Sequence, residues 1–202
     1  YTFCVFATPV GPYFKGGLSA IDLLISEENH RAAPGGSGGV KAIGNYAPGM
    51  MPSKNAKKQG FAEVIYLDAV EHKYIEEVGA ANYFCIKDNV LYTPELTGTI
   101  LPGITRESII MLARHRGYEV NETQVSAEFA MTADESFCCG TAAVISPIAS
   151  ITQGENKKVF GVGGVGVITR ELYDALTNLQ TEINEDPFGW LHEVNLNLAL
   201  YQ

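Results

Sequence analysis

The chain has 202 residues, of which 46% are hydrophobic and 18% charged, and its formal net charge is −9 at pH 7. This length is sufficient for one large domain, or two small ones, with a core that needs no disulfide or metal. The acidic excess disfavours nucleic acid and anionic membranes as partners, and no apolar run approaches the roughly 20 residues of a membrane span. We therefore expect neither partner, and we expect any anionic ligand to be held by backbone N–H groups and helix N-termini.

Segments with strand character outnumber those with helical character. Eight segments are bounded by turn residues and carry strand-like apolar runs; they are 2–7, 17–26, 63–68, 73–78, 82–87, 90–92, 118–125 and 134–149. The three short ones between 73 and 92 are close enough together to form an antiparallel meander. The pattern predicts a mixed α/β fold that is rich in strands.

Helical periodicity is clearest in two places. Thr105 is a natural N-cap for a helix over 105–116, which Gly117 ends, and a second helix is expected to begin at Thr169. A less regular helix is expected over 44–58, and a short helical turn near 126–131.

The cysteines and histidines do not form a metal-binding or disulfide pattern. The four cysteines follow no zinc spacing and include an adjacent pair, and the four histidines stand apart from one another. We therefore expect no metal, and buried thiols in a reducing cytoplasm. The sequence does not distinguish the cytoplasm from an organelle.

The segment 161–166, GVGGVG, matches the Gly-x-Gly-x-x-Gly pattern of dinucleotide-binding loops. Such a site also needs a βαβ unit in which a second parallel strand ends in an acidic residue. The helix expected from Thr169 is followed by EDPFGW rather than by a strand. The glycines are therefore interpreted as a flexible turn, and an NAD site is the weaker alternative.

Lys41 stands at the end of a glycine loop, in GGVKAIGNYA, without charged neighbours. Glycines allow close backbone approach and leave the amine uncovered. Tyr46 follows five residues later, and Glu77 lies in EEVGAANYF, where small residues adjoin an apolar strand. Taken alone, Glu77 could be a solvated residue at a strand edge and Tyr46 an ordinary core tyrosine, so the interpretation depends on these residues occurring together.

Two further segments supply backbone N–H groups and a hydroxyl where an element begins or ends. GTILPGITR places Gly103, Ile104 and Thr105 at a helix N-terminus, and CCGTAAVISP places Thr141 and Ala142 at the end of a strand. An amine, a phenol, a carboxylate and two anion sites are the groups that pyridoxal 5′-phosphate requires.

The order and spacing of these motifs resemble those of the branched-chain amino acid aminotransferases, which belong to the fold-type IV pyridoxal-phosphate enzymes. The resemblance extends from TPVGPYF to DPFGWLHEV and is carried by GGVKAIGNYA, EEVGAANYF, GTILPGITR and CGTAAVISP. It implies that residues 1–202 are the large C-terminal, cofactor-binding domain of such an enzyme. The small N-terminal domain, which supplies an arginine for the phosphate, is then absent from this chain.

The resemblance implies a role for each matching residue. Lys41 would form the Schiff base and shuttle the proton, and Glu77, rather than Glu76, would pair with the ring nitrogen. The other implied cofactor contacts are the ring or phosphate neighbours Arg31, Tyr46, Leu101, Gly103, Ile104, Thr105 and Thr141. The implied substrate contacts are Tyr13, Thr141 and Ala142.

The implied reaction moves the amino group between L-branched-chain amino acids (Leu, Ile, Val) and 2-oxoglutarate, and the implied assembly is a homodimer. Two alternatives on the same fold are a D-amino acid transaminase and an aminodeoxychorismate lyase. A third alternative is that the isolated chain is an inactive fragment.

Overall fold

The computed structural model of the protein describes residues 2–6, 8–9 and 18–193. Within this part of the chain, nine strands form one sheet. They are β1 (Ile21–Ser26), β2 (Glu63–Leu67), β3 (Ile75–Val78), β4 (Ala81–Lys87), β5 (Val90–Pro94), β6 (Val120–Thr123), β7 (Glu135–Gly140), β8 (Val144–Gln153) and β9 (Asn156–Val159).

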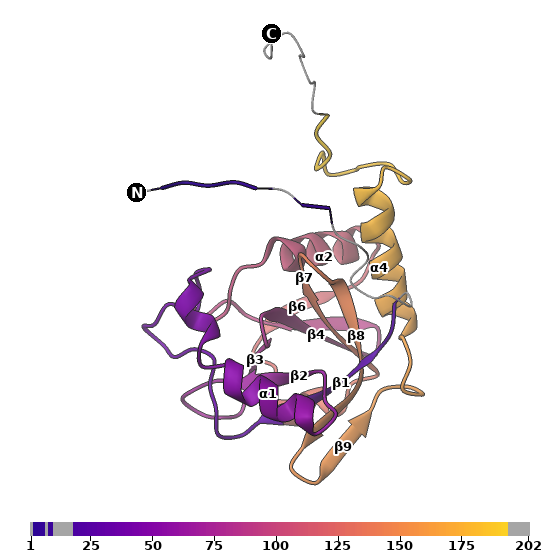
Figure 1. Ribbon diagram of the computed structural model, residues 1–202. Coiled ribbons are helices and arrows are strands. Elements are labelled where there is room, and N and C mark those ends of the chain that lie inside the picture. The colour runs from indigo at the N-terminus through magenta and orange to yellow at the C-terminus, as the bar shows by residue number, and fades with distance from the viewer. Residues whose placement is uncertain (1, 7, 10–17, 194–202) are drawn as a thin grey trace.

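Six of these strands close into a barrel. The strand order is β3-β2-β1-β8-β7-β4, and pairing of β3 with β4 completes the ring (Figure 1). Strand β1 is parallel to both of its neighbours, and the other barrel pairs are antiparallel. Strands β5 and β6 extend the sheet from β4, and β9 pairs with β8.

The closed sheet buries one apolar cluster, and the helices bury another. Leu23, Ile65, Tyr83 and Ile151 belong to the first cluster and are at most 1% exposed. The second lies where α2 (Ile104–His115) and α4 (Val167–Gln180) pack on each other and on β7. Burial of such side chains, at about 25 cal/mol per Å² of apolar surface, is the main stabilising contribution to this fold.

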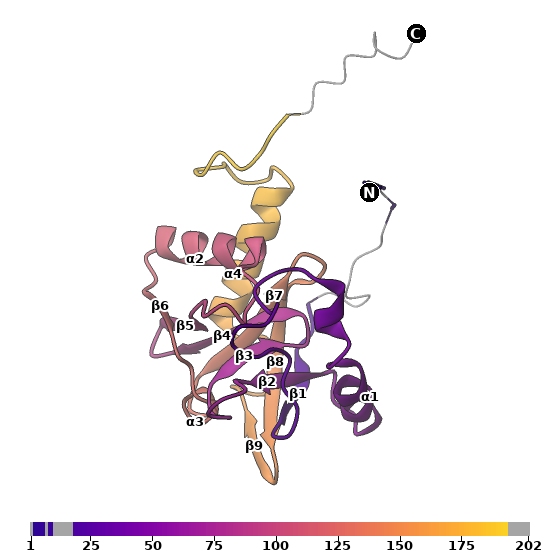
Figure 2. The ribbon, with the colours of Figure 1, turned by 90° about the vertical axis from the view of Figure 1, so that its left-hand side faces the viewer.

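Helix α1 (Met50–Lys58) packs on β2, after a single 3-10 turn, η1 (Ile43–Tyr46). Figure 2 shows α1 on the opposite side of the barrel from α2. A short helix, α3 (Ala127–Ala130), precedes β7. None of the helices in the described ranges is long and apolar enough to cross a membrane.

The mixed, strand-rich α/β prediction is confirmed, including the antiparallel meander of β3, β4 and β5. The expected strand 2–7 is wrong over its described residues, because 2–6 pair with no strand there and Phe3 is 92% exposed. The single strand expected over 134–149 is two strands, because a turn at 141–143 separates β7 from β8. Helix α2 begins at Ile104 with Gly103 as its N-cap, so Thr105 lies in its first turn.

Candidate active site

Glu77 lies on β3 and forms a buried ion pair with Arg31. Arg31 Nη1 is 2.6 Å from Glu77 Oε2, and the two side chains are 5% and 2% exposed. Arg31 follows β1 in the chain, and its Nη1 also donates to the carbonyl of Thr99 at 3.2 Å. A buried charge is costly unless it is paired and hydrogen-bonded, so this arrangement holds the Glu77 carboxylate in place.

The other oxygen of Glu77 is held by two N–H donors. Glu77 Oε1 accepts from the backbone N–H of Leu101 and from Asn82 Nδ2, each at 3.2 Å. Asn82 Nδ2 also donates to the Leu101 carbonyl at 2.9 Å. A side chain at Gly103 would overlap Asn82 Oδ1 and displace the Asn82 amide from its hydrogen bonds, so glycine suits the place where this cluster meets the start of α2.

Burial raises the pKa of Glu77 to about 7, although the Arg31 guanidinium and the Leu101 N–H act in the opposite direction. The carboxyl group therefore titrates near neutral pH, and a cation placed beside it would favour the ionised form. Strongly perturbed carboxyl groups of this kind are typical of functional sites.

Glu76 takes no part in this cluster. Successive side chains of a strand point to opposite faces, and Glu76 Oε1 accepts instead from the hydroxyl of Thr99. The assignment of the functional role to Glu77 rather than Glu76 agrees with this geometry.

The first turn of α2 contains the residues expected to hold a phosphate. Gly103 is the N-cap, with no side-chain hydrogen bond at the cap, and Ile104 and Thr105 follow it. The first N–H groups of an α-helix have no intrahelical acceptor and carry the positive end of the helix dipole, so they suit an anion. Thr141 and Ala142, the second predicted anion site, are exposed in the turn between β7 and β8.

The glycine loop before Lys41 packs against the segment that leads to α2. A side chain at Gly38 would overlap the carbonyl oxygen of Thr99, and one at Gly39 would lie 2.8 Å from that of Gly98. These two glycines therefore serve close contact between backbones. That contact anchors the loop on the segment that continues to Leu101 and Gly103.

Asn45, which is 8% exposed, fixes the loop on its other side. Its Nδ2 donates to the carbonyl oxygens of Ser37 and Val40 at 2.7 and 2.8 Å, and its Oδ1 accepts from the Ser37 hydroxyl at 2.6 Å. Val40 directly precedes Lys41. The backbone of Lys41 is thus positioned by a neighbour in η1, while its side chain is exposed.

Tyr46 and Arg31 line one cavity of about 200 Å³, together with Tyr66 and Gly79. Burial, with a smaller contribution from the charge of Glu63, raises the pKa of Tyr66 to about 12, so this phenol stays protonated. Its hydroxyl lies 3.3 Å from the Gly49 carbonyl, the acceptor for its proton.

The structure joins three of the predicted residues directly, because Arg31 pairs with Glu77 and the Leu101 N–H donates to Glu77, and Gly103 packs against Asn82, which donates to Glu77. Tyr46 shares a cavity with Arg31, and Ile104 and Thr105 follow Gly103 in the chain. No ion pair or hydrogen bond in the described ranges joins the Lys41 or Thr141 side chain to this group, and Tyr13 lies outside those ranges. The sequence interpretation missed Asn45, Asn82 and Thr99, although all three stand inside motifs that it used.

The GVGGVG segment forms turns between β9 and α4, and the chain's own Glu135 occupies the N-terminus of that helix. The Glu135 carboxylate accepts from the N–H groups of Ile168 and Thr169 at 3.1 and 2.9 Å. A bound pyrophosphate needs these same donors. Strand β9 is moreover antiparallel to β8, and no strand follows α4 up to residue 193, which argues against the NAD alternative.

Similarity to known proteins extends over most of the chain. The model of the amino-transferase class IV family matches residues 2–151. The chain is 49% identical, over 190 residues, to branched-chain-amino-acid aminotransferase 5, chloroplastic, of Arabidopsis thaliana, covering 94% of this chain and 46% of that protein. It is 48% identical to branched-chain amino acid aminotransferase 2, chloroplastic, of Humulus lupulus, covering 96% and 48%.

Solved structures show the same likeness. The branched-chain amino acid aminotransferase of Escherichia coli superposes with a TM-score of 0.83 at 39% identity, covering 93% of this chain and 60% of that one. A second branched-chain amino acid aminotransferase, solved with pyridoxamine 5′-phosphate, gives a TM-score of 0.80 at 28% identity, covering 92% and 59%. The chain spans about half the length of the curated relatives it matches. With three quarters of its residues matched by the family model, the chain belongs to the class IV aminotransferases.

Proposed function

We propose that residues 1–202 are the large cofactor-binding domain of a pyridoxal-phosphate-dependent aminotransferase. Its reaction moves the amino group between L-branched-chain amino acids and 2-oxoglutarate. The observation that carries the proposal is the buried Arg31–Glu77 pair beside the N-terminus of α2. The names of the relatives, and the pyridoxamine 5′-phosphate in one of the superposed structures, support the substrate and the cofactor.

The residues present fit this cofactor. A carboxyl group with a pKa of about 7 is suited to hold a pyridinium N–H, because the cation restores the charge that burial disfavours. The uncapped first turn of α2 suits a phosphate dianion. The Glu77 carboxyl group and the N-terminus of α2 are linked by the segment before the helix. The backbone N–H of Leu101 in that segment donates to Glu77, and Gly103 is the N-cap of α2.

Each side chain is then assigned a role. Glu77 would keep the ring nitrogen protonated, Gly103 to Thr105 and Thr141 would bind phosphate, and Tyr46 would donate to the ring oxygen. When bound, pyridoxal 5′-phosphate supplies an aldehyde for the amino group and a ring that accepts electron density from the substrate Cα. Lys41 Nζ would take the Cα proton of the substrate and deliver it to C4′ of the cofactor, as a general base and then a general acid. Arg31 would orient Glu77.

Substrate recognition is assigned to the turn at Thr141 and Ala142 and to Tyr13. The N–H groups of that turn would bind the substrate carboxylate, which removes the need for a buried cation there. The pocket must accept both an aliphatic side chain and the second carboxylate of 2-oxoglutarate, so it needs apolar walls with polar groups at the rim.

The assembly and the compartment belong to the same proposal. A homodimer is expected from the resemblance and is tested by light scattering of the longer protein that contains this chain. The buried, free thiols of Cys85, Cys138 and Cys139 favour a reducing compartment such as the cytoplasm. The named relatives include chloroplastic and mitochondrial proteins, so imaging of the tagged full-length protein decides the compartment.

The deciding experiment is an amino-group transfer assay with L-valine, D-valine and 2-oxoglutarate. Transfer from L-valine, with a visible absorption band from bound cofactor, is the expected result. Transfer from D-valine alone would favour a D-amino acid transaminase, and pyruvate release from aminodeoxychorismate would favour the lyase. A chain that shows neither band nor turnover, beside an active longer protein, would identify residues 1–202 as an inactive fragment.

A further inference from the structure

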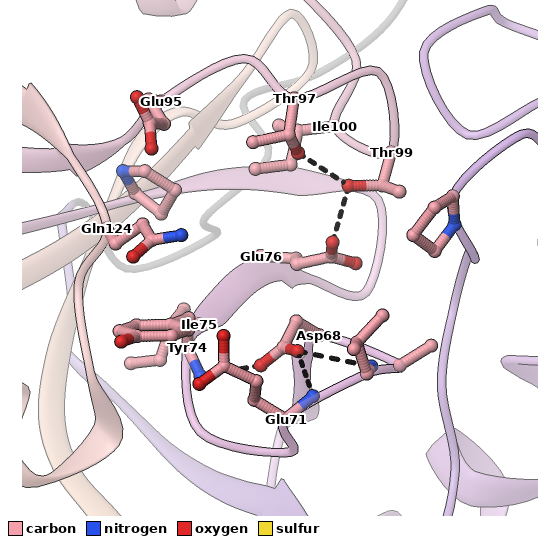
Figure 3. A pocket seen from close by; sticks show the side chains of 14 residues that line it. Asp68, Glu71, Tyr74, Ile75, Glu76, Glu95, Thr97, Thr99, Ile100 and Gln124 are labelled. Carbon is pink, nitrogen blue, oxygen red and sulfur yellow. Dashed lines mark hydrogen bonds between the residues drawn. The ribbon is translucent and has the colours of Figure 1, made fainter.

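A second cavity, of about 260 Å³, lies on the Glu76 side of β3 (Figure 3). Its walls come from the loop after β2, from β3 itself and from the segment that follows β5. The polar lining is dominated by carboxyl groups, namely Asp68, Glu71, Glu76 and Glu95, and the lining contains no lysine, arginine or histidine. Pro34, Pro94 and Ile100 provide an apolar surface beside them.

Glu76 is the group that indicates a ligand. The residue is 6% exposed, and Figure 3 shows its carboxylate directed into the cavity. Its Oε1 accepts from Thr99, whereas Oε2 is buried and has no hydrogen-bond partner in the described part of the chain. A buried carboxylate oxygen without a donor carries a desolvation cost that a bound donor would remove.

The neighbouring charges make the demand for a cation stronger. Burial alone would raise the pKa of Asp68, but four backbone N–H groups together lower it to about 2, so Asp68 stays ionised. Burial raises the pKa of Glu76 and the charge of Asp68 adds to this, whereas the Thr99 hydroxyl and, more weakly, the charge of Arg31 oppose it. Lys73 Nζ, 5.2 Å from the centre of the Tyr74 ring, is not part of the lining.

We propose that this cavity binds a small substituted ammonium ion, whose N–H donates to Glu76 Oε2 and whose alkyl groups contact Pro34, Pro94 and Ile100. Tyr74 lines the same cavity and offers an aromatic ring for a cation–π contact (Figure 3). A metal ion is a poorer fit, because the described residues contain no group of three side chains arranged to hold one. The inference does not depend on the proposed aminotransferase activity.

The test measures binding of trimethylammonium to the cofactor-loaded full-length protein by ligand-observed NMR and calorimetry. A tertiary amine cannot condense with an aldehyde, so a signal cannot come from the cofactor. Its neutral near-isostere tert-butanol is the matched probe. Trimethylammonium is expected to bind at least about tenfold more tightly than tert-butanol, because tert-butanol can still donate its O–H to Glu76 but lacks the positive charge that attracts the carboxylates of the cavity.

Glu76→Gln should weaken trimethylammonium binding about tenfold or more, while Gln keeps an acceptor for Thr99. Glu128→Gln, an exposed change on α3, removes the same charge away from the cavity and should leave affinity unchanged. Equal binding of the two probes to the unaltered protein would overturn the proposal without any variant. Equal losses in both variants would overturn it too, because they would show attraction to the net charge alone.

Discussion

Arg31 Nη1 lies 2.6 Å from Glu77 Oε2, and almost no solvent reaches either side chain. The pair joins the loop after β1 to β3, across 46 residues of sequence, and the carbonyl of Thr99 holds the arginine from a third segment. Removing one member of a buried pair leaves the other charge uncompensated, which commonly costs about 3–5 kcal/mol. The pair is therefore both a structural link and the centre of the candidate site.

Glu77→Gln is expected to keep cofactor binding and lose most turnover. The amide cannot hold a proton on the ring nitrogen, so the ring becomes a poor electron acceptor, whereas the Lys41 amine is untouched. The measurements are the visible absorption band and kcat for L-valine. Glu76→Gln is the matched control on the same strand, and an inactive control beside a fully active Glu77→Gln would show that the roles are reversed.

The stability of the cofactor-free protein should depend on Glu77 between about pH 4.5 and pH 7. The folded pKa of about 7 exceeds the ordinary 4.5, so the folded state binds the proton more tightly than the unfolded state does. The contribution of protonated Glu77 to the free energy of unfolding is therefore complete below pH 4.5. This contribution, about 3 kcal/mol in total, is lost as the pH rises through 7. Urea unfolding at pH 5 and pH 7.5 should show this loss in the unaltered protein and not in Glu77→Gln. Parallel pH profiles in the two proteins would contradict it.

Asn45 is expected to position Lys41 through the Ser37–Val40 loop. Asn45→Ala removes both N–H donors and the acceptor, and Asn45→Asp keeps only the acceptor for the Ser37 hydroxyl. Both variants should slow the appearance of the visible band when cofactor is added to cofactor-free protein, by about tenfold, since Asn45→Ala loses three part-buried hydrogen bonds and Asn45→Asp loses two. Ser37→Ala, which keeps both Asn45 donors, should be milder. Unchanged rates in all three would show that the loop is held by other contacts.

Much of the fold was predictable because its strands carry their own signals. The runs that became β2 to β5 are apolar and bounded by turn residues, so their existence and antiparallel pairing followed from local sequence. Barrel closure was not predictable, since it also depends on β1 pairing with β8 and on β4 pairing with β7, and these strands lie far apart in the sequence. The exposed segment 2–6 shows the limit of apolarity alone, because a strand needs a partner edge as well.

The sequence motifs predicted which residues form the site, but not the contacts that hold those residues in place. The sequence identified Glu77 and Arg31 separately, but the hydrogen bonds of Asn82 and Thr99 that hold them cross 5 and 68 positions and leave no local pattern. The need for glycine at Gly38 was anticipated as close backbone approach. Its partner, the Thr99 carbonyl, appears only in three dimensions.

The two predicted phosphate contacts can be tested by Thr105→Ala and Thr141→Ala. Each removes one hydroxyl donor to a charged group, worth about 1.5–3 kcal/mol, so cofactor affinity should fall about tenfold or more per site. Ser108→Ala is the control within α2, because its hydroxyl donates to the Ile104 carbonyl of its own helix. Equilibrium dialysis gives the affinities and circular dichroism the fold. Unchanged affinity in both threonine variants would place the phosphate elsewhere.

Lys41 should be the one lysine that borohydride links to the cofactor. Lys41 follows a loop whose Gly38 and Gly39 pack closely on the backbone of residues 98–99. No carboxylate in the described ranges forms an ion pair with its amine. Lys57, by contrast, lies 3.4 Å from Glu63 and also donates to Ser53. A lysine without an ion-pair partner has only to lose its proton before it can attack an aldehyde, whereas a paired ammonium must also lose its partner.

The measurement is peptide mapping of the loaded full-length protein after reduction. A pyridoxyl label confined to the Lys41 peptide is expected, and Lys41→Arg, which keeps the charge, should abolish both the label and the visible band. A label on Lys54, Lys57, Lys58 or Lys73 in the unaltered protein would refute the assignment of Lys41. No label on any lysine would refute the pyridoxal-phosphate proposal, because reduction traps this linkage whatever the substrate preference of the enzyme.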